Sequence, residues 1–256
     1  MAHQLDYKIH GDDMQAVEIA LDPGEAVNAE AGAMLFIEDD VHMETSTGGG
    51  VMKGLKRAIT GESFFITRFQ NQGAQLRHVT FAAPYPGKIV PLDLGQSGEW
   101  LCQKDAYLCS AYGVDISIAF SKRLGAGLFG GEGFILQKLS GDGFVFAHAG
   151  GTIIERVLQA GETLRVDTGC LVAFESRVDY DIQFVGGFKN ALFGGEGLFF
   201  AVMRGPGRVF LQTLPFSRLA DRVVAASGLK RGGAKGERKG VAGLGGGIIK
   251  DLLSGD

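Results

Sequence analysis

Short segments of the chain alternate hydrophobic and polar residues. In VDISIAF (114–120) every second residue is a large apolar one, with Asp, Ser and Ala between them, and VDYDIQF (178–184) has the same pattern. A period of two is typical of a β-strand that buries one face. Glycine is frequent (41 of 256 residues) and proline is rare (6), which indicates tight turns between short strands. The pattern predicts an all-β chain arranged as antiparallel sandwiches or barrels.

One segment has helical spacing instead. In PFSRLADRVVAAS (215–227), Leu219, Val223 and Val224 form an apolar stripe along one side of a helix. Pro215 suits the first turn, where its missing N–H costs no hydrogen bond. We therefore predict a short C-terminal helix over 215–227.

The string LFGGEG occurs twice, at 128–133 and at 192–197, and a weaker copy, TGES, stands at 60–63. Similar strand and turn signals surround each copy in the same order. Repetition of this kind is the signature of tandem structural units. We predict one β domain over 1–227 with pseudo-threefold symmetry. Its three repeats span about 14–86, 87–150 and 151–215.

The residues shared by these strings are interpreted as structural. Glycine permits a positive φ and close approach of backbones, and a glutamate at the bend can accept backbone N–H groups. A phosphate-binding loop fits poorly, because the string matches neither GxGxxG nor GxxxxGK[ST] and contains no lysine. The residues that define the repeat are Gly61, Glu62, Gly131, Glu132, Gly195 and Glu196.

A second interpretation of the acidic residues stays open. Pseudo-threefold symmetry would gather one carboxylate from each repeat around an axis, and a ring of carboxylates can hold a hard cation. Repetition copies structural residues equally well, so we predict no metal ion and no other cofactor. The two candidate triplets are Glu62, Glu132 and Glu196, and Glu30, Asp105 and Asp167.

An insertion in the first repeat, STGGGVMKGLKRA (46–58), combines glycines with Lys53, Lys56 and Arg57. Glycine-rich backbone beside basic side chains can bind anions. We treat these three residues as a speculative interaction loop. A solvated loop that ends in a short helical turn is the alternative.

The last segment, 228–256, is a glycine-rich tail with six basic and three acidic residues, and it ends in the apolar stretch IIKDLL (248–253). Such a tail could dock on a neighbouring subunit or contact an anionic membrane surface. A disordered tail is the alternative. The whole chain carries a net charge of −4, so the body without this basic tail is acidic, and we expect no nucleic-acid partner.

The residue types of common catalytic sites are present but not in catalytic patterns. The three cysteines, Cys102, Cys109 and Cys170, lack CxxC spacing and are interpreted as small buried residues. His78 and His148 are the only histidines that could correspond between repeats. The motifs HExxH and GxSxG are absent. We expect no catalytic residues.

The sequence also indicates a compartment. The N-terminus has no basic and apolar leader, and no apolar run is long enough for a membrane helix. Together with the low cysteine count, this predicts a cytoplasmic protein with no transmembrane segment.

Several of these strings together resemble a known family. The pattern T-G-G-G-x-x-x-G-L-K-R-x-x-T-G-E at 47–62, the L-x-x-G-E turns and the repeated F-G-G-E-G resemble the mitochondrial biogenesis (altered inheritance of mitochondria) family, over about 1–215 and the glycine-rich C-terminus. The resemblance implies tandem copies of the fold of the tryptophan RNA-binding attenuation protein. It supplies no catalytic residues. Mitochondrial members are associated with inner-membrane organisation, but this chain has no recognisable transit peptide.

These observations favour a non-enzymatic β-scaffold that acts through protein–protein interaction or self-assembly, as a homo-oligomer. A binding module for a small molecule or RNA is the alternative, and it rests on fold analogy. An enzyme of unknown type is the third possibility. It would need a pocket that holds a His or Cys beside a perturbed carboxylate.

Overall fold

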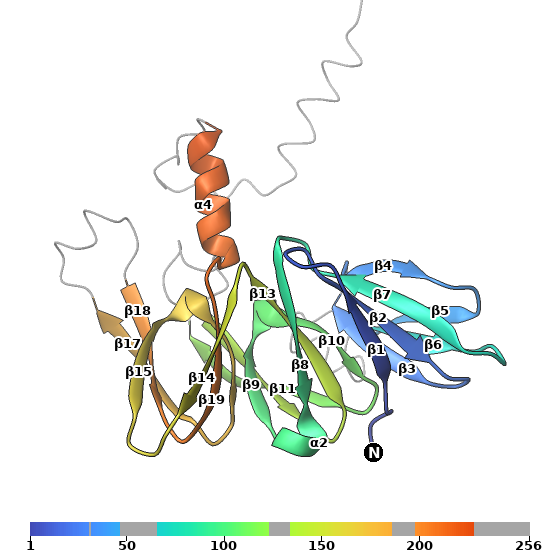
Figure 1. Ribbon diagram of the computed structural model, residues 1–256, viewed down its shortest axis with the longest axis horizontal. Helices are drawn as coiled ribbons and strands as arrows, with labels where there is room; N and C mark the ends of the chain where they lie inside the picture. The colour runs from blue at the N-terminus through green and yellow to red at the C-terminus, as the bar shows by residue number, and fades with distance from the viewer. Residues whose placement is uncertain (31, 47–65, 123–133, 186–197, 228–256) are drawn as a thin grey trace, which may run out of the picture. The chain divides into compact units, whose positions relative to one another are not determined.

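The computed structural model describes residues 1–30, 32–46, 66–122, 134–185 and 198–227 (Figure 1). These residues form antiparallel β-sheets, two short 3₁₀ turns, a one-turn helix α2 (Leu94–Ser97) and a helix α4 (Phe216–Ala226) near the C-terminus. The prediction of an all-β fold with a short C-terminal helix is confirmed.

The strands follow one another closely along the chain, as the glycine-rich turns predicted. The first seven are β1 (Asp6–His10), β2 (Ala16–Leu21), β3 (Ala26–Glu30), β4 (Met34–Ile37), β5 (Val41–Ser46), β6 (Ile66–Asn71) and β7 (Arg77–Ala82). The next six are β8 (Gly87–Asp93), β9 (Trp100–Gln103), β10 (Tyr107–Ala111), β11 (Asp115–Lys122), β12 (Phe134–Ser140) and β13 (Phe144–Gly150). The last six are β14 (Ile153–Leu158), β15 (Thr163–Asp167), β16 (Leu171–Glu175), β17 (Asp179–Val185), β18 (Leu198–Arg204) and β19 (Gly207–Gln212).

The strands form four sheets in the described part of the chain. The two larger sheets have six strands each, in the orders β5-β6-β3-β10-β13-β8 and β11-β12-β9-β16-β19-β14. The two smaller sheets have the orders β1-β2-β7-β4 and β15-β18-β17. Each six-stranded sheet therefore joins three strands from one stretch of the chain to three strands from the next.

The same pairing order occurs three times along the chain. In β2–β7, the first and third strands pair with the sixth, and the second and fourth pair with the fifth. The strands β8–β13 pair in this order, and so do β14–β19. The three-repeat organisation with pseudo-threefold symmetry stays a prediction, which this pairing order supports.

Two of the L-x-x-G-E turns have the same internal bonds. At Asp22–Glu25 and at Gln159–Glu162, the glutamate carboxylate accepts the backbone N–H of the first turn residue, at 2.9 and 2.7 Å. The glycines between them, Gly24 and Gly161, have φ of +88° and +85°, a region that residues with a Cβ rarely adopt. The glycine and the glutamate of this motif thus serve one tight turn.

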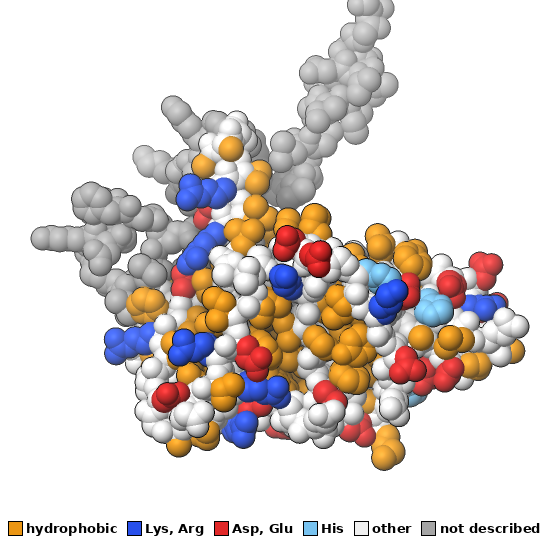
Figure 2. Space-filling model, in the orientation of Figure 1, with side chains coloured by type: hydrophobic (Ala, Val, Ile, Leu, Met, Phe, Trp, Pro, Cys, Tyr) orange, Lys and Arg blue, Asp and Glu red, His pale blue; other side chains and the backbone are white. Residues whose placement is uncertain are grey.

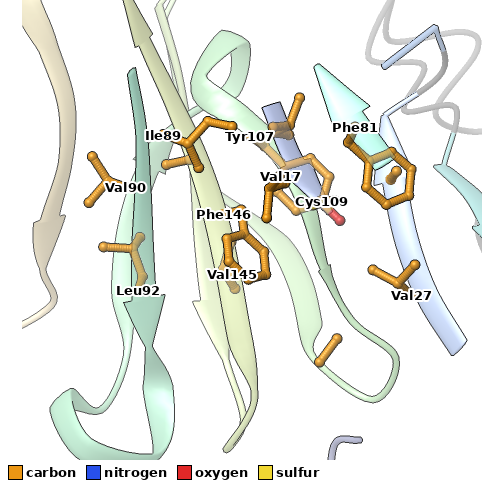
Figure 3. Close-up of a cluster of buried hydrophobic side chains, with 14 of the residues drawn as sticks. Val17, Val27, Phe81, Ile89, Val90, Leu92, Tyr107, Cys109, Val145 and Phe146 are labelled. Atoms are coloured by element: carbon orange, nitrogen blue, oxygen red, sulfur yellow. The ribbon is translucent and has the colours of Figure 1, made fainter. Parts of the chain in front are cut away.

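The core lies between the sheets, where alternate residues of many strands meet. Figure 3 shows one part of it, in which side chains from β2, β3, β7, β8, β10 and β13 converge, among them Val17, Phe81 and Phe146. A second cluster, around Phe134, Phe174 and Met203, belongs to the later strands. The alternation at 178–184 is confirmed, since Val178 and Ile182 are buried and Asp179 and Asp181 are exposed.

One alternating segment departs from its pattern. In β11 the register with β12 shifts between Ile118 and Phe120, and Ile118 is exposed although its sequence position predicts a buried side chain. A bulge of this kind adds a residue to one strand, so the side chains around it change face.

The contacts divide the chain into two units, residues 1–220 and 221–256. Helix α4 begins in the first unit and ends in the second, and none of its residues is buried. Its first turn is held by the first unit, where Arg218 Nη2 lies 2.7 Å from Asp167 Oδ2 and the ring of Phe216 lies 5.3 Å from that of Tyr85.

Candidate functional site

The structure does not describe most of the residues that the sequence singled out. The repeat-defining Gly61, Glu62, Gly131, Glu132, Gly195 and Glu196 lie outside the described residues, as do the loop residues Lys53, Lys56 and Arg57 and the tail 228–256. Their roles stay predictions.

The second acidic triplet is described. Glu30 and Asp105 both raise the pKa of Tyr85 electrostatically, in addition to the larger effect of burial, and so lie near that side chain. Asp167 is engaged elsewhere, because it accepts the Gly169 N–H at 3.0 Å and pairs with Arg218. Within the described ranges, no group of three or more His, Cys, Asp or Glu side chains could hold a metal ion.

The two histidines that could have corresponded have different surroundings. His78 is partly exposed, and its Nδ1 lies 3.2 Å from Glu38, whose pKa is lowered mainly by a hydrogen bond from the His78 backbone. His148 on β13 is buried, and among the described residues neither of its ring nitrogens has a partner with good hydrogen-bond geometry, although the Tyr85 backbone lies near the ring. Burial lowers the pKa of His148 to about 4, which the backbone of Tyr85 only partly opposes. His148 is therefore neutral near pH 7.

All three cysteines are free thiols. Burial raises the pKa of Cys102 to about 12, and it raises the pKa of Cys109 well above the ordinary value. Cys170 is half-buried, and burial raises its pKa as well. A thiol with a raised pKa is protonated near pH 7 and is a weak nucleophile.

A small pocket of about 120 Å³ lies beside Trp100. Its lining includes Asp93, Gln96, Ser97, Arg208 and Phe210. Trp100 is completely buried, more so than its size alone predicts, and its indole N–H donates to Ser97 Oγ at 2.7 Å. The Arg208 guanidinium lies 5.1 Å from the Trp100 ring, within the range of a cation–π contact.

A buried carboxylate fixes Arg208 at this pocket. Glu175 accepts from Arg208 Nε at 2.7 Å and from Arg177 Nε at 2.6 Å. Burial opposes ionisation of Glu175, but the bonds from the two arginines outweigh it and hold its pKa below the usual value. The pocket therefore presents a cation that is already paired, together with polar groups from Ser97 and Gln96.

Strand β4 exposes large apolar side chains. Leu35 and Phe36 are consecutive residues of this strand and are 59% and 45% exposed. In β4 the register with β7 shifts between Met34 and Phe36. Strands β10 and β16 have the same shift at the same place, between Tyr107 and Cys109 in β10 and between Leu171 and Ala173 in β16. The counterparts of Leu35 and Phe36 are completely or almost completely buried. These counterparts are Leu108 and Cys109 in β10, and Val172 and Ala173 in β16.

Other apolar side chains are exposed on β14 and α4. Ile154 and Val157 on β14 are exposed, and Figure 2 shows hydrophobic side chains gathered over the region of β8 and β14 between charged ones. On α4, Phe216, Val223 and Val224 are exposed and Leu219 is half-buried, so the described residues leave most of the predicted apolar stripe uncovered. Among the described helices, none is long and apolar enough to cross a membrane.

Comparisons of the sequence and of the structure with known proteins identify a family and two similar bacterial proteins. A model of the family described as mitochondrial biogenesis AIM24 matches residues 7–214. The uncharacterised protein M6_Spy0233 of Streptococcus pyogenes serotype M6 is 30% identical over 215 residues, which cover 80% of this chain and 83% of that protein. The crystal structure of protein SPYM3_0169 from Streptococcus pyogenes is similar with a TM-score of 0.72 and 26% identity, over 87% of this chain and 100% of the other. The match to the family model spans nearly all of the described strands, and the chain belongs to the mitochondrial biogenesis AIM24 family.

Proposed function

We propose that the protein is a non-enzymatic β-scaffold that acts by binding other proteins, including copies of itself. The observation that carries this proposal is the exposure of Leu35 and Phe36 on β4, whereas their counterparts in β10 and β16, which lie inside six-stranded sheets, are buried. In the described part of the chain β4 lies at a sheet edge, and exposed large apolar side chains at such an edge are a usual site of protein association.

The organisation of the chain supports this role. We propose that residues 14–86, 87–150 and 151–215 are three repeats of one antiparallel unit, related by approximate threefold symmetry as in the attenuation protein fold. The recurrent pairing order of β2–β7, β8–β13 and β14–β19 supports it. A scaffold of repeated units joined through their sheets offers the same edges for attaching further units.

The location that we propose is the cytoplasm. The three cysteines are free, and two of them are buried where disulfide formation would require the core to open. Free thiols are typical of proteins in reducing compartments.

A photo-reactive cross-linker tests the scaffold proposal in the protein's own host. We expect p-benzoylphenylalanine in place of Phe36 in the full chain to form discrete protein adducts, identified by mass spectrometry. The control carries the cross-linker in place of Leu76, an apolar residue in the turn before β7 that is 48% exposed. Absence of adducts at Phe36 in folded protein, or the same adducts at Leu76, would contradict the proposal.

The pocket beside Trp100 favours a second candidate function, the binding of a small polar molecule. Its volume of about 120 Å³ admits only a few heavy atoms, and Gln96, Ser97 and Arg208 in its lining carry hydrogen-bond donors. Trp100 is the only tryptophan, so intrinsic fluorescence reports on the pocket. Titration with formate, acetate and inorganic phosphate should give a saturable change that Arg208→Gln weakens and Lys138→Gln does not. A linear or absent response to all three would exclude this function.

A further inference from the structure

The two smaller sheets look incomplete beside the two larger ones. In the six-stranded sheets the junction between successive stretches of chain is a strand pair, β3 with β10 and β9 with β16. By position in the pairing order, β4 corresponds to β10 and β16, and β15 corresponds to β3 and β9. Within the described residues, β4 and β15 each pair on one side only, with β7 and β18. Strands β4 and β15 thus lie at sheet edges in the described part of the chain, whereas their counterparts β10, β16, β3 and β9 lie inside sheets.

The two existing junctions have the same register. Cys109 lies opposite Ala29 in the first, and Ala173 lies opposite Cys102 in the second. Phe36 is the counterpart of Cys109 and Ala173, as the register shifts of β4, β10 and β16 established.

The counterpart of Cys102 in β15 is also fixed by the structure. Gln103 precedes the 3₁₀ turn Lys104–Ala106, and Asp167 precedes the 3₁₀ turn Thr168–Cys170. Since β10 and β16 begin directly after these turns, Gln103 corresponds to Asp167, and Cys102 corresponds to Val166. A third junction of the same kind would therefore place Phe36 opposite Val166.

The side chains of β4 and β15 are more exposed than those of their counterparts inside the larger sheets. In β9, Trp100, Leu101 and Cys102 are all buried. In β15 the corresponding residues are Leu164, Arg165 and Val166, of which Leu164 is half-buried, Arg165 is exposed and Val166 is buried. Leu35 and Phe36 on β4 and Leu164 and Arg165 on β15 are therefore less covered by the described residues than their counterparts inside the larger sheets.

We propose that β4 of one copy pairs antiparallel with β15 of a second copy, so that the two smaller sheets become one sheet in the order β1-β2-β7-β4-β15-β18-β17. Phe36 lies opposite Val166, Ile37 opposite Arg165, and Glu38 opposite Leu164. This inference rests on the proposed scaffold function and names its partner and its contact.

A second copy is the occupant because it supplies the matching edge. Within one chain β4 and β15 belong to different sheets and do not pair. At the new junction Arg165 on β15 would lie diagonally across from the acidic Asp39 just after β4, within reach of a long side chain. The contact is head-to-tail, so copies extend into a ring or a chain.

Cysteine cross-linking between two differently tagged variants tests the register. Opposite residues of an antiparallel pair have Cβ atoms about 5 Å apart, near disulfide geometry. Ile37→Cys and Arg165→Cys, each in a Cys170→Ser background, should form a mixed dimer when combined and oxidised with diamide. Thr163→Cys, two residues out of register, should cross-link to Ile37→Cys about tenfold less. Equal yields from the two pairs, or no mixed dimer, would overturn the proposed register.

Analytical ultracentrifugation of the full chain tests the association itself. We expect concentration-dependent association that the double variant Leu35→Lys, Phe36→Lys weakens about tenfold or more, since two charges replace the apolar contact. Val157→Lys, an exposed apolar residue on β14, should leave it unchanged. Circular dichroism confirms that both variants are folded. A wild-type chain that stays monomeric, or association that is lost in Val157→Lys and kept in the double variant, would overturn the inference.

The scaffold proposal and this inference fail separately. A monomeric chain whose Phe36 cross-linker still captures other proteins would leave the scaffold function standing and remove the self-pairing. Adducts that join Phe36 of one copy to residues 163–167 of another would support both.

Discussion

Replacing Trp100 with alanine should lower the free energy of unfolding by about 4 kcal/mol, at the upper end of single core substitutions. Trp100 is completely buried, and its ring stacks on Phe210 at 5.5 Å between centroids. It also lies in β9, opposite Glu175 of β16, in the strand pair that joins two stretches of the chain. Its removal leaves a large cavity and takes away the indole N–H that donates to Ser97 Oγ. Urea unfolding followed by far-ultraviolet circular dichroism measures the change.

Two control variants separate the cavity from other effects. Trp100→Phe keeps most of the buried ring and loses the indole N–H bond, so we expect a loss of about 1 to 2 kcal/mol. Phe216→Ala removes an aromatic ring that is 54% exposed on α4, and it should cost about 0.5 kcal/mol or less. A loss in Trp100→Ala no larger than that in Phe216→Ala would show that Trp100 does not support the junction between β9 and β16.

The class of fold could be predicted because the strands obey a local rule. Val178 and Ile182 are buried and Asp179 and Asp181 are exposed, as period two requires. The apolar stripe of 215–227 likewise indicated helix α4. Where the rule failed, at Ile118, the cause was a bulge that depends on the partner strand β12, and nothing within 114–120 signals it.

The candidate interaction surface could not be predicted, because it depends on pairing between distant strands. In sequence, MLFI at 34–37 resembles YLCSA at 107–111 and LVAFE at 171–175, and all three suit a buried strand. Only the sheet order shows that, among the described strands, β4 lacks the second neighbour that β10 and β16 have. The hydrogen bond between Glu175 and Arg208 could not be predicted for the same reason, because the β-sheet brings together residues that are distant along the chain.

The protein should lose about 2 kcal/mol of stability between pH 7 and pH 5 because of one side chain, His148. Its pKa is lowered from 6.5 to about 4 by burial. Below pH 6.5 the unfolded chain binds a proton at this position and the folded chain does not, so stability falls with pH until about pH 4. The complete loss at that point is about 3 kcal/mol. Urea midpoints measured at half-unit steps of pH follow the change.

The substitution His148→Gln should remove most of this dependence. Gln212 shows that the fold accepts a glutamine there, because Gln212 faces Ile153 of β14 as His148 faces Ile89 of β8. His42→Gln, at an exposed position on β5, keeps the buried imidazole and should behave as the wild type. Glu38 and Glu175 have lowered pKa values, so their stabilising effect is lost only as pH falls through a range below about 4.5. The change in stability between pH 7 and pH 5 is therefore assigned to His148. A slope in His148→Gln equal to that of the wild type would show that the imidazole is protonated in the folded state, and that β13 or its neighbours open to solvate it.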